Sequence, residues 1–142
     1  MIRFATAAAA LLLTAAPALA QPADNRIILT FETGARTGSV MVALYDSAAA
    51  YDGNNGRPVA AVAVPASGAT VVATFENLPA GDYAMKAYHD VNGDGEMNTN
   101  PFGIPTEPYA FSNNAVGNMG PARWAAARFT VAGETAQTIR IR

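Results

Sequence analysis

The chain contains no cysteine among its 142 residues. This absence excludes a disulfide framework, and it excludes a lipid anchor attached to an N-terminal cysteine. Histidine is nearly absent as well, since His89 is the only one. Zinc usually takes three or four nitrogen or sulfur ligands, so the composition argues against a zinc site. A lone histidine at the end of a strand is more often a hydrogen-bonded structural residue than a general base.

Positive charge is also scarce, with nine Lys and Arg against eleven Asp and Glu and no basic cluster. Nucleic acid and anionic membrane surfaces are recognised by concentrated positive charge, so we expect neither as a partner. No apolar run reaches the roughly 20 residues that a helix needs to cross a bilayer. We therefore expect no membrane insertion, which leaves a small ligand, an ion, a glycan or another protein.

The first twenty residues have the pattern of a secretory signal peptide. Arg3 precedes an apolar run over 7–16, and Ala18-Leu19-Ala20 comes directly before the expected cleavage at Gln21. We predict a signal peptide at 1–20 and one domain at 21–142, located in the periplasm or secreted. Removal of Arg3 leaves eight basic and eleven acidic residues, a net charge near −3.

Short segments rich in Val, Ile, Thr, Tyr and Phe alternate with clusters of Gly, Pro and Asn, as is typical of strands. We predict strands at 26–32, 39–45, 59–64, 69–75, 82–89, 124–131 and 135–142. Hairpins are expected across 65–68 and 132–134, and a short helical turn near 48–50. This pattern predicts an all-β fold, a seven-stranded antiparallel Greek-key β-sandwich with a long loop after the fifth strand. A small barrel would give the same pattern.

The long connection over 90–121 begins like an EF-hand calcium loop. Oxygen donors occupy loop positions one, three, five, seven and nine: Asp90, Asn92, Asp94, the carbonyl of Glu96, and Asn98. Position twelve is Pro101 instead of a bidentate Glu, so the site would need another oxygen. Glu107 is the strongest candidate for it. The sequence predicts Ca²⁺ at this loop, or alternatively an Asx- and Gly-rich turn in which Glu107 caps backbone amides.

Aromatic side chains concentrate in or beside the same connection: Tyr88, Phe102, Tyr109, Phe111 and Trp124. If exposed in a row, Tyr109, Phe111 and Trp124 would form a platform for sugar rings or a protein partner. If buried, the aromatic residues would form a satellite core. We favour burial, because a loop of this length has few other ways to offset its ordering entropy.

Two motifs indicate a family. The segment FENLPAGDYA at 75–84 resembles a signature of prealbumin-like, carboxypeptidase-regulatory-type β-sandwich domains. The segments HDVNGDG at 89–95, FGIPTE at 102–107 and YAFSNNA at 109–115 resemble the bacterial secreted family called domain of unknown function 2141. This resemblance covers nearly the whole mature chain. It implies a prealbumin-like sandwich and export, and it implies no particular activity.

We predict a non-enzymatic binding or structural module of the periplasm or cell envelope, with a loop ordered by Ca²⁺ and an envelope protein or glycan as partner. Glycan binding through the loop aromatics is the first alternative. A small hydrolase using His89 and Glu107 is the second. A triad of Ser112, His89 and Asp90 is not favoured, because neighbouring strand residues point to opposite faces and no Gly-x-Ser-x-Gly elbow is present.

Overall fold

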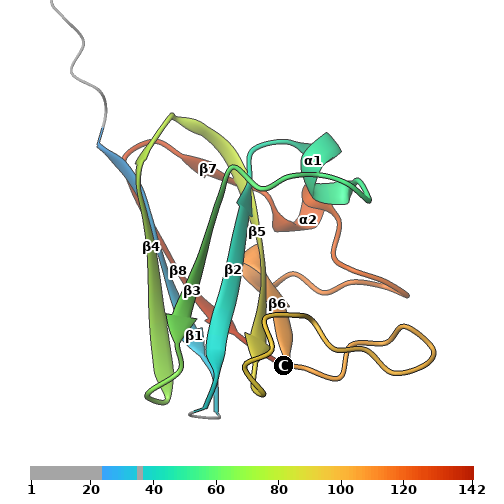
Figure 1. Cartoon of the computed structure of the whole chain (residues 1–142). Coiled ribbons are helices and arrows are strands. Elements are labelled where there is room, and N and C mark those ends of the chain that lie inside the picture. Colours follow the sequence, from blue (N-terminus) through green and yellow to red (C-terminus); the bar gives the residue numbers. More distant parts are fainter. Residues whose placement is uncertain (1–23, 35–36) are drawn as a thin grey trace, which may run out of the picture.

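Two β-sheets lie face to face in the computed structural model, which describes residues 24–34 and 37–142 (Figure 1). The smaller sheet has the strand order β4-β1-β8; the larger has the order β3-β2-β5-β6, with β7 paired to the start of β5. The strands are β1 (Asn25–Glu32), β2 (Ser39–Tyr45), β3 (Ala60–Pro65), β4 (Thr70–Leu78), β5 (Gly81–Asp90), β6 (Tyr109–Phe111), β7 (Phe129–Val131) and β8 (Glu134–Arg140). The predicted signal peptide, 1–20, lies outside the described residues.

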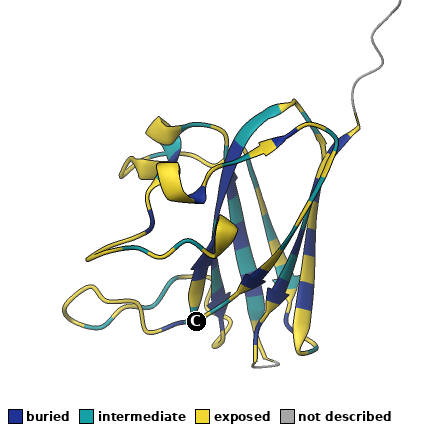
Figure 2. Ribbon diagram, turned by 180° about the vertical axis from the view of Figure 1, so that it is seen from behind, coloured by how far each residue is buried: buried dark blue, intermediate teal, exposed yellow. Residues whose placement is uncertain are grey.

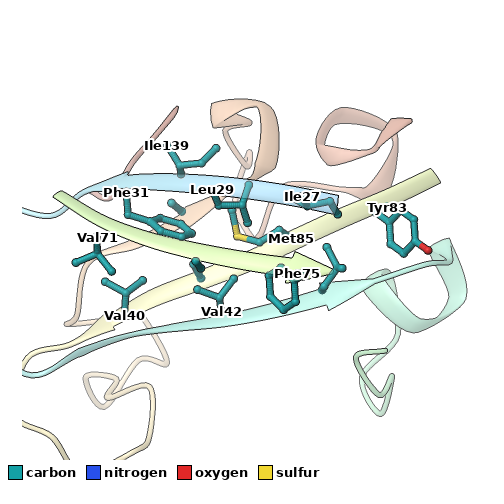
Figure 3. Close-up of a cluster of buried hydrophobic side chains, with 14 of the residues drawn as sticks. Ile27, Leu29, Phe31, Val40, Val42, Val71, Phe75, Tyr83, Met85 and Ile139 are labelled. Atoms are coloured by element: carbon teal, nitrogen blue, oxygen red, sulfur yellow. The ribbon is translucent and has the colours of Figure 1, made fainter. Parts of the chain in front are cut away.

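Period-two alternation places one face of each central strand in the core. Ile27, Leu29 and Phe31 of β1 are fully buried. Val40 and Val42 of β2 face them from the larger sheet (Figure 3). The strands predicted at 26–32 and 39–45 are therefore confirmed, together with the faces on which their apolar residues lie.

The predicted topology is wrong in three respects. The described chain has eight strands instead of seven, and β1 pairs with β8 in parallel. The observed strand order also does not match the predicted Greek-key arrangement. Alternation of apolar residues identifies a strand and its buried face, but it carries no information about which strand lies beside it or in which direction that strand runs.

Both predicted hairpins are crossings between the two sheets. β3 pairs with β2 whereas β4 pairs with β1, so the link at 66–69 changes sheets. Ala66 is buried in this link and its N–H donates to the Gly38 carbonyl at 3.0 Å. In the same way, β7 pairs with β5 whereas β8 pairs with β1, and Gly133 makes the turn between them with φ +99°. A short link between two apolar runs looks the same in sequence for a hairpin and for a crossing.

Residues 124–131 form a short helix and a short strand, where a single strand was predicted. The helix is α2 (Trp124–Ala127), and β7 follows it directly. Three consecutive alanines at 125–127 favour the helix, since alanine has the highest helix propensity. The N–H of Arg128 closes the turn on the Trp124 carbonyl at 2.8 Å. In the described ranges no helix has the length and hydrophobicity needed to span a membrane.

The remaining short elements lie beside the larger sheet. The helical turn predicted near 48–50 is present as α1 (Ala48–Asp52), where the Ser47 hydroxyl accepts from the Ala50 N–H at 3.4 Å. β6 and the 3₁₀ segment η1 (Ser112–Asn114) lie within the long connection 90–121, whose sequence has no regular alternation of apolar and polar residues. Three residues are too few for a periodic signal, which explains why β6 was missed.

Two loops, 91–108 and 115–123, extend from the larger sheet on the same side of the molecule (Figures 1 and 2). Most of their residues are exposed. The first follows β5 and the second follows η1, so β6 lies between them in the chain. These loops form the walls of the candidate site.

Candidate functional site

A groove of about 1110 Å³ lies on the outer face of the larger sheet. Its floor is made by side chains that alternate with the core residues of β2, β3, β5 and β6: Met41, Ala43, Tyr45, Ala61, Ala63, Lys86, Tyr88, Tyr109 and Phe111. The solvent face of an antiparallel sheet is normally polar. Here the floor is mainly aliphatic and aromatic, which is unusual for the outer face of a sheet.

The two loops supply apolar walls. Met97 and the segment 102–105 line the groove from the first loop, and the segment 119–121 lines it from the second. Three of the wall side chains are strongly exposed: Phe102 at 88%, Ile104 at 59% and Met119 at 103%. Large apolar side chains gathered around a concave surface are typical of a binding site.

Among the residues that the structure describes, Lys86 is the one charged residue that lines the groove. It is also the only lysine of the sequence. Its Nζ donates to the Tyr51 carbonyl at 2.5 Å. The same Nζ lies 4.4 Å from the centre of the Tyr51 ring and 5.2 Å from that of Tyr45. Burial lowers the pKa of Lys86, and the negative charge of Asp52 opposes this effect. Lys86 was not among the predicted site residues, although its being the only lysine could have indicated it.

The predicted aromatic platform is divided between two places. Tyr109 and Phe111 line the groove, with ring centres 5.7 Å apart in an edge-to-face arrangement. Trp124 instead packs against Tyr51 at 5.9 Å, in a second hydrophobic cluster that joins α1 and α2. The expectation that the loop aromatics are buried holds for Phe111, at 8% exposure, and is wrong for the exposed Phe102 and Tyr109.

Asp90, the first residue of the predicted calcium loop, is buried and fully engaged by backbone amides. Its Oδ1 accepts from the N–H groups of Gly93 at 2.7 Å and Asp94 at 3.2 Å, and its Oδ2 accepts from Gly95 at 2.9 Å. Positive φ angles at Gly93 and Gly95 allow the backbone to curl round the carboxylate. The loop is thus folded around the carboxylate of Asp90.

Glu107 returns to this loop, as the sequence suggested. Its side chain is buried, and its two oxygens accept from Val91 N–H at 3.0 Å and Asn98 N–H at 3.2 Å. The carboxylate therefore joins the start of the loop to its later part. Of the two roles predicted for Glu107, the geometry shows the amide cap.

The other predicted ligands form a small polar network at the surface. The Oδ2 of Asp94 accepts from the side-chain amides of Asn92 and Asn98, each at 2.9 Å. These bonds, with one from the Glu96 N–H, lower the pKa of Asp94. The described residues contain no group of three or more His, Cys, Asp or Glu side chains arranged to hold a metal. A cation binding here would have to displace hydrogen bonds that the loop already makes.

His89 of the hydrolase alternative and Ser112 of the disfavoured triad both bond to backbone atoms, while among the described residues the Nδ1 of His89 has no hydrogen-bond partner. His89 is fully buried and its Nε2 donates to the Thr37 carbonyl at 2.7 Å. Ser112 is also buried, donating to the Ala127 carbonyl at 2.6 Å and accepting from the Met85 N–H at 2.9 Å. These hydrogen bonds join β5 to the segments beside it.

A family model described as "Uncharacterized protein conserved in bacteria (DUF2141)" matches residues 32–140. The chain belongs to this family. The match includes the groove, both loops and the acidic turn, and it confirms the family predicted from the motifs at 89–115. No curated protein and no solved structure matches the chain.

Proposed function

We propose that this DUF2141 protein is a non-enzymatic binding module whose groove on the larger sheet takes an apolar ligand. The observation that carries the proposal is the groove itself, about 1110 Å³ in volume, whose lining within 24–34 and 37–142 includes a single charged residue. Ligand pockets are commonly several hundred Å³ in size, mostly apolar, with a few polar groups that orient the ligand. An aliphatic ligand would gain roughly 0.8 kcal/mol for each methylene that it buries.

The acidic loop supports this function by its position. Asp90 and Glu107 hold the ends of a loop whose later residues, Phe102 and Ile104, form a wall of the groove. We propose that the protein works in the periplasm or outside the cell, as the sequence at 1–20 predicts, with an envelope component as ligand or partner. A prealbumin-like relationship of the sandwich likewise stays a prediction.

Glycan binding stays the alternative function. Its support is the contact between Tyr109, which is 41% exposed, and Phe111 on the groove floor. Trp124 is not part of this aromatic pair, because it packs against Tyr51 instead. Binding of envelope polysaccharides that perturbs Tyr109 but leaves Trp124 fluorescence unchanged would favour this alternative.

The proposed function predicts that filling the groove floor abolishes binding. Ala43 pairs with Ala61 of β3 and Lys86 of β5, so Ala43→Trp would place an indole in the middle of the groove. The neutral fluorescent probe N-phenyl-1-naphthylamine should bind the parent saturably, and Ala43→Trp should weaken its binding by roughly tenfold or more, equivalent to at least 1.4 kcal/mol.

Ala136→Trp is the matched control, because Ala136 is an exposed strand residue of β8 in the other sheet. This variant should bind the probe like the parent. Probe binding that is absent in the parent, or equally weakened by both substitutions, would refute an apolar site in this groove.

Calcium binding to the acidic loop also stays a proposal, supported by the oxygen donors at alternate positions 90–98. If it occurs, calcium at about 100 times its Kd should stabilise the fold by ~2.7 kcal/mol, seen as a rise in melting temperature. Asp94→Ala should remove this rise, and Glu76→Ala, which changes an exposed acid of β4, should not. Identical melting of the parent in calcium and in chelator would eliminate the proposal.

A further inference from the structure

We propose that the ligand of the groove is an amphipathic molecule with one anionic head group bound at Lys86 and an apolar chain lying toward the wall formed by Phe102 and Ile104. The inference rests on the proposed function and specifies its ligand class. A carboxylate on an alkyl chain is the simplest member of that class.

The first support is the state of the Lys86 ammonium group. Lys86 is half-buried, and among the described residues no carboxylate forms an ion pair with it. The negative charge of Asp52 acts on Lys86 without forming an ion pair, and the Asp52 Oδ1 accepts instead from the Trp124 N–H at 3.1 Å. Of its three N–H donors, one is used by the Tyr51 carbonyl, and the Tyr45 and Tyr51 rings lie within cation–π distance. An ammonium group in an apolar groove binds an anion more strongly than an exposed one, because the effective dielectric constant is lower.

The second support is the direction of the groove along β5. Lys86 pairs with Ala43 and Phe111, and Tyr88, two residues further on, pairs with Met41 and Tyr109. The floor therefore continues from the cation over apolar side chains toward the end of β5. The first loop begins there, and its residues at 97 and 102–105 close this part of the groove.

The third support is the distribution of charge along this direction. The Tyr88 hydroxyl donates to the Gly95 carbonyl at 3.0 Å, so the acidic loop adjoins the end of the groove remote from Lys86. Burial raises the pKa of Tyr88, and the negative charges of Asp90, Glu107, Asp94 and Glu96 raise it further. An anionic head group is thus attracted at one end and repelled at the other, which orients the molecule.

An amphipathic cation is the less favoured ligand. The acids that would attract it are of two kinds: Asp90 and Glu107 are already bonded to backbone amides, whereas Asp94 and Glu96 are exposed. Exposed charges are screened by water and salt. In the described part of the chain, Lys86 is the only charged residue of the groove lining itself.

The test compares decanoate, decanol and decyltrimethylammonium, which share one alkyl chain and differ in head-group charge. Each is titrated below its micelle concentration against the parent, Lys86→Met and Lys86→Arg, by displacement of N-phenyl-1-naphthylamine. We expect decanoate to bind the parent roughly tenfold more tightly than decanol, and each further methylene to add about fourfold until the groove is full. Lys86→Met should remove the preference for decanoate while keeping decanol binding, and Lys86→Arg should retain it.

A second measurement needs no variant. Because Lys86 is the only lysine, its acetylation by an amine-reactive ester can be followed by mass spectrometry of one peptide. Decanoate should slow this reaction, whereas decyltrimethylammonium should not. Lack of protection by decanoate would overturn the proposal even if Lys86→Met failed to fold.

The outcomes separate this inference from the proposed function. If all three compounds bind equally and substitution of Lys86 changes none of their affinities, the proposal of an anionic head group is overturned and the proposal of an apolar groove remains. Tightest binding of the cation would also overturn it. If neither the probe nor any of the three compounds binds, both proposals are overturned. They are also overturned if light scattering shows a dimer and the groove of that dimer does not bind the probe.

Discussion

Asp90→Ala should destabilise the protein by about 3 kcal/mol, because the buried carboxylate accepts three backbone hydrogen bonds. Hydrogen bonds to a charged group contribute about 1.5–3 kcal/mol each. The expected loss is smaller than their sum, because water can enter the variant and bond to some of the freed N–H groups. The segment 93–95 would lose the group around which it curls. Chemical denaturation in the presence of chelator measures this effect without any contribution from calcium.

Asp94→Ala is the matched control, since Asp94 lies in the same loop and is exposed. Water can replace the hydrogen bonds that Asp94 accepts, so its loss should cost well under half as much, about 1 kcal/mol or less. Equal destabilisation by the two substitutions would show that the carboxylate of Asp90 does not organise the loop in the way described.

Gly38→Ala should be comparably destabilising, for a steric reason. Gly38 has φ +72°, and a Cβ atom there would lie 1.8 Å from the backbone carbonyl oxygen of Asp90. The left-handed conformation alone costs a residue with a side chain about 1–2 kcal/mol. The overlap with a backbone atom cannot be relieved by rotating a side chain, so we expect a total loss of about 3 kcal/mol or more, at the upper end of single substitutions.

Gly34→Ala separates the two contributions. Gly34 has a similar φ of +66°, but a Cβ atom there would meet nothing within 4 Å. Its substitution should therefore show only the conformational cost, about 1–2 kcal/mol. If thermal melting gave the same loss for both glycines, close packing of Gly38 on Asp90 would not be needed for stability.

Both predictions concern the point where the groove wall joins the sandwich. Asp90 is the last residue of β5, it pairs with Ser39 at the start of β2, and its carboxylate shapes the loop that follows. Glu107 binds the same loop from the segment that leads into β6. The wall is consequently held by hydrogen bonds at its base, while Phe102 extends into solvent. We expect substitutions at this base to weaken probe binding as well as folding.

The acidic turn and the groove differ in how far they could be predicted. Asp90, Gly93 and Gly95 lie close together in sequence, and the tendency of Asx and Gly residues to form tight turns is local. Glu107 was also predicted to return to this loop, as a ligand or as an amide cap. The groove was not predicted, because its floor combines residues of β2, β3, β5 and β6 that are adjacent only after the sheet has formed.

The positions of the aromatic side chains likewise could not be predicted from their spacing in the sequence. Tyr109, Phe111 and Trp124 appeared to be one group because they are near in sequence. Three alanines after Trp124 form a helical turn, and this turn places the indole against Tyr51 on α1. Tyr109 and Phe111 remain with the sheet through the pairing of β6 with β5. Pairing partners thus decided which aromatic rings face the groove.

The sequence by itself determined the family, the all-β class, the buried faces of β1 and β2, and the local turn at Asp90, since these depend on composition, period and short-range geometry. Only the tertiary structure decided that β1 and β8 run parallel, that the two expected hairpins change sheets, and that Lys86 lines a mainly apolar groove. Those features arise from contacts between distant segments, and an apolar residue pattern is equally compatible with many such pairings.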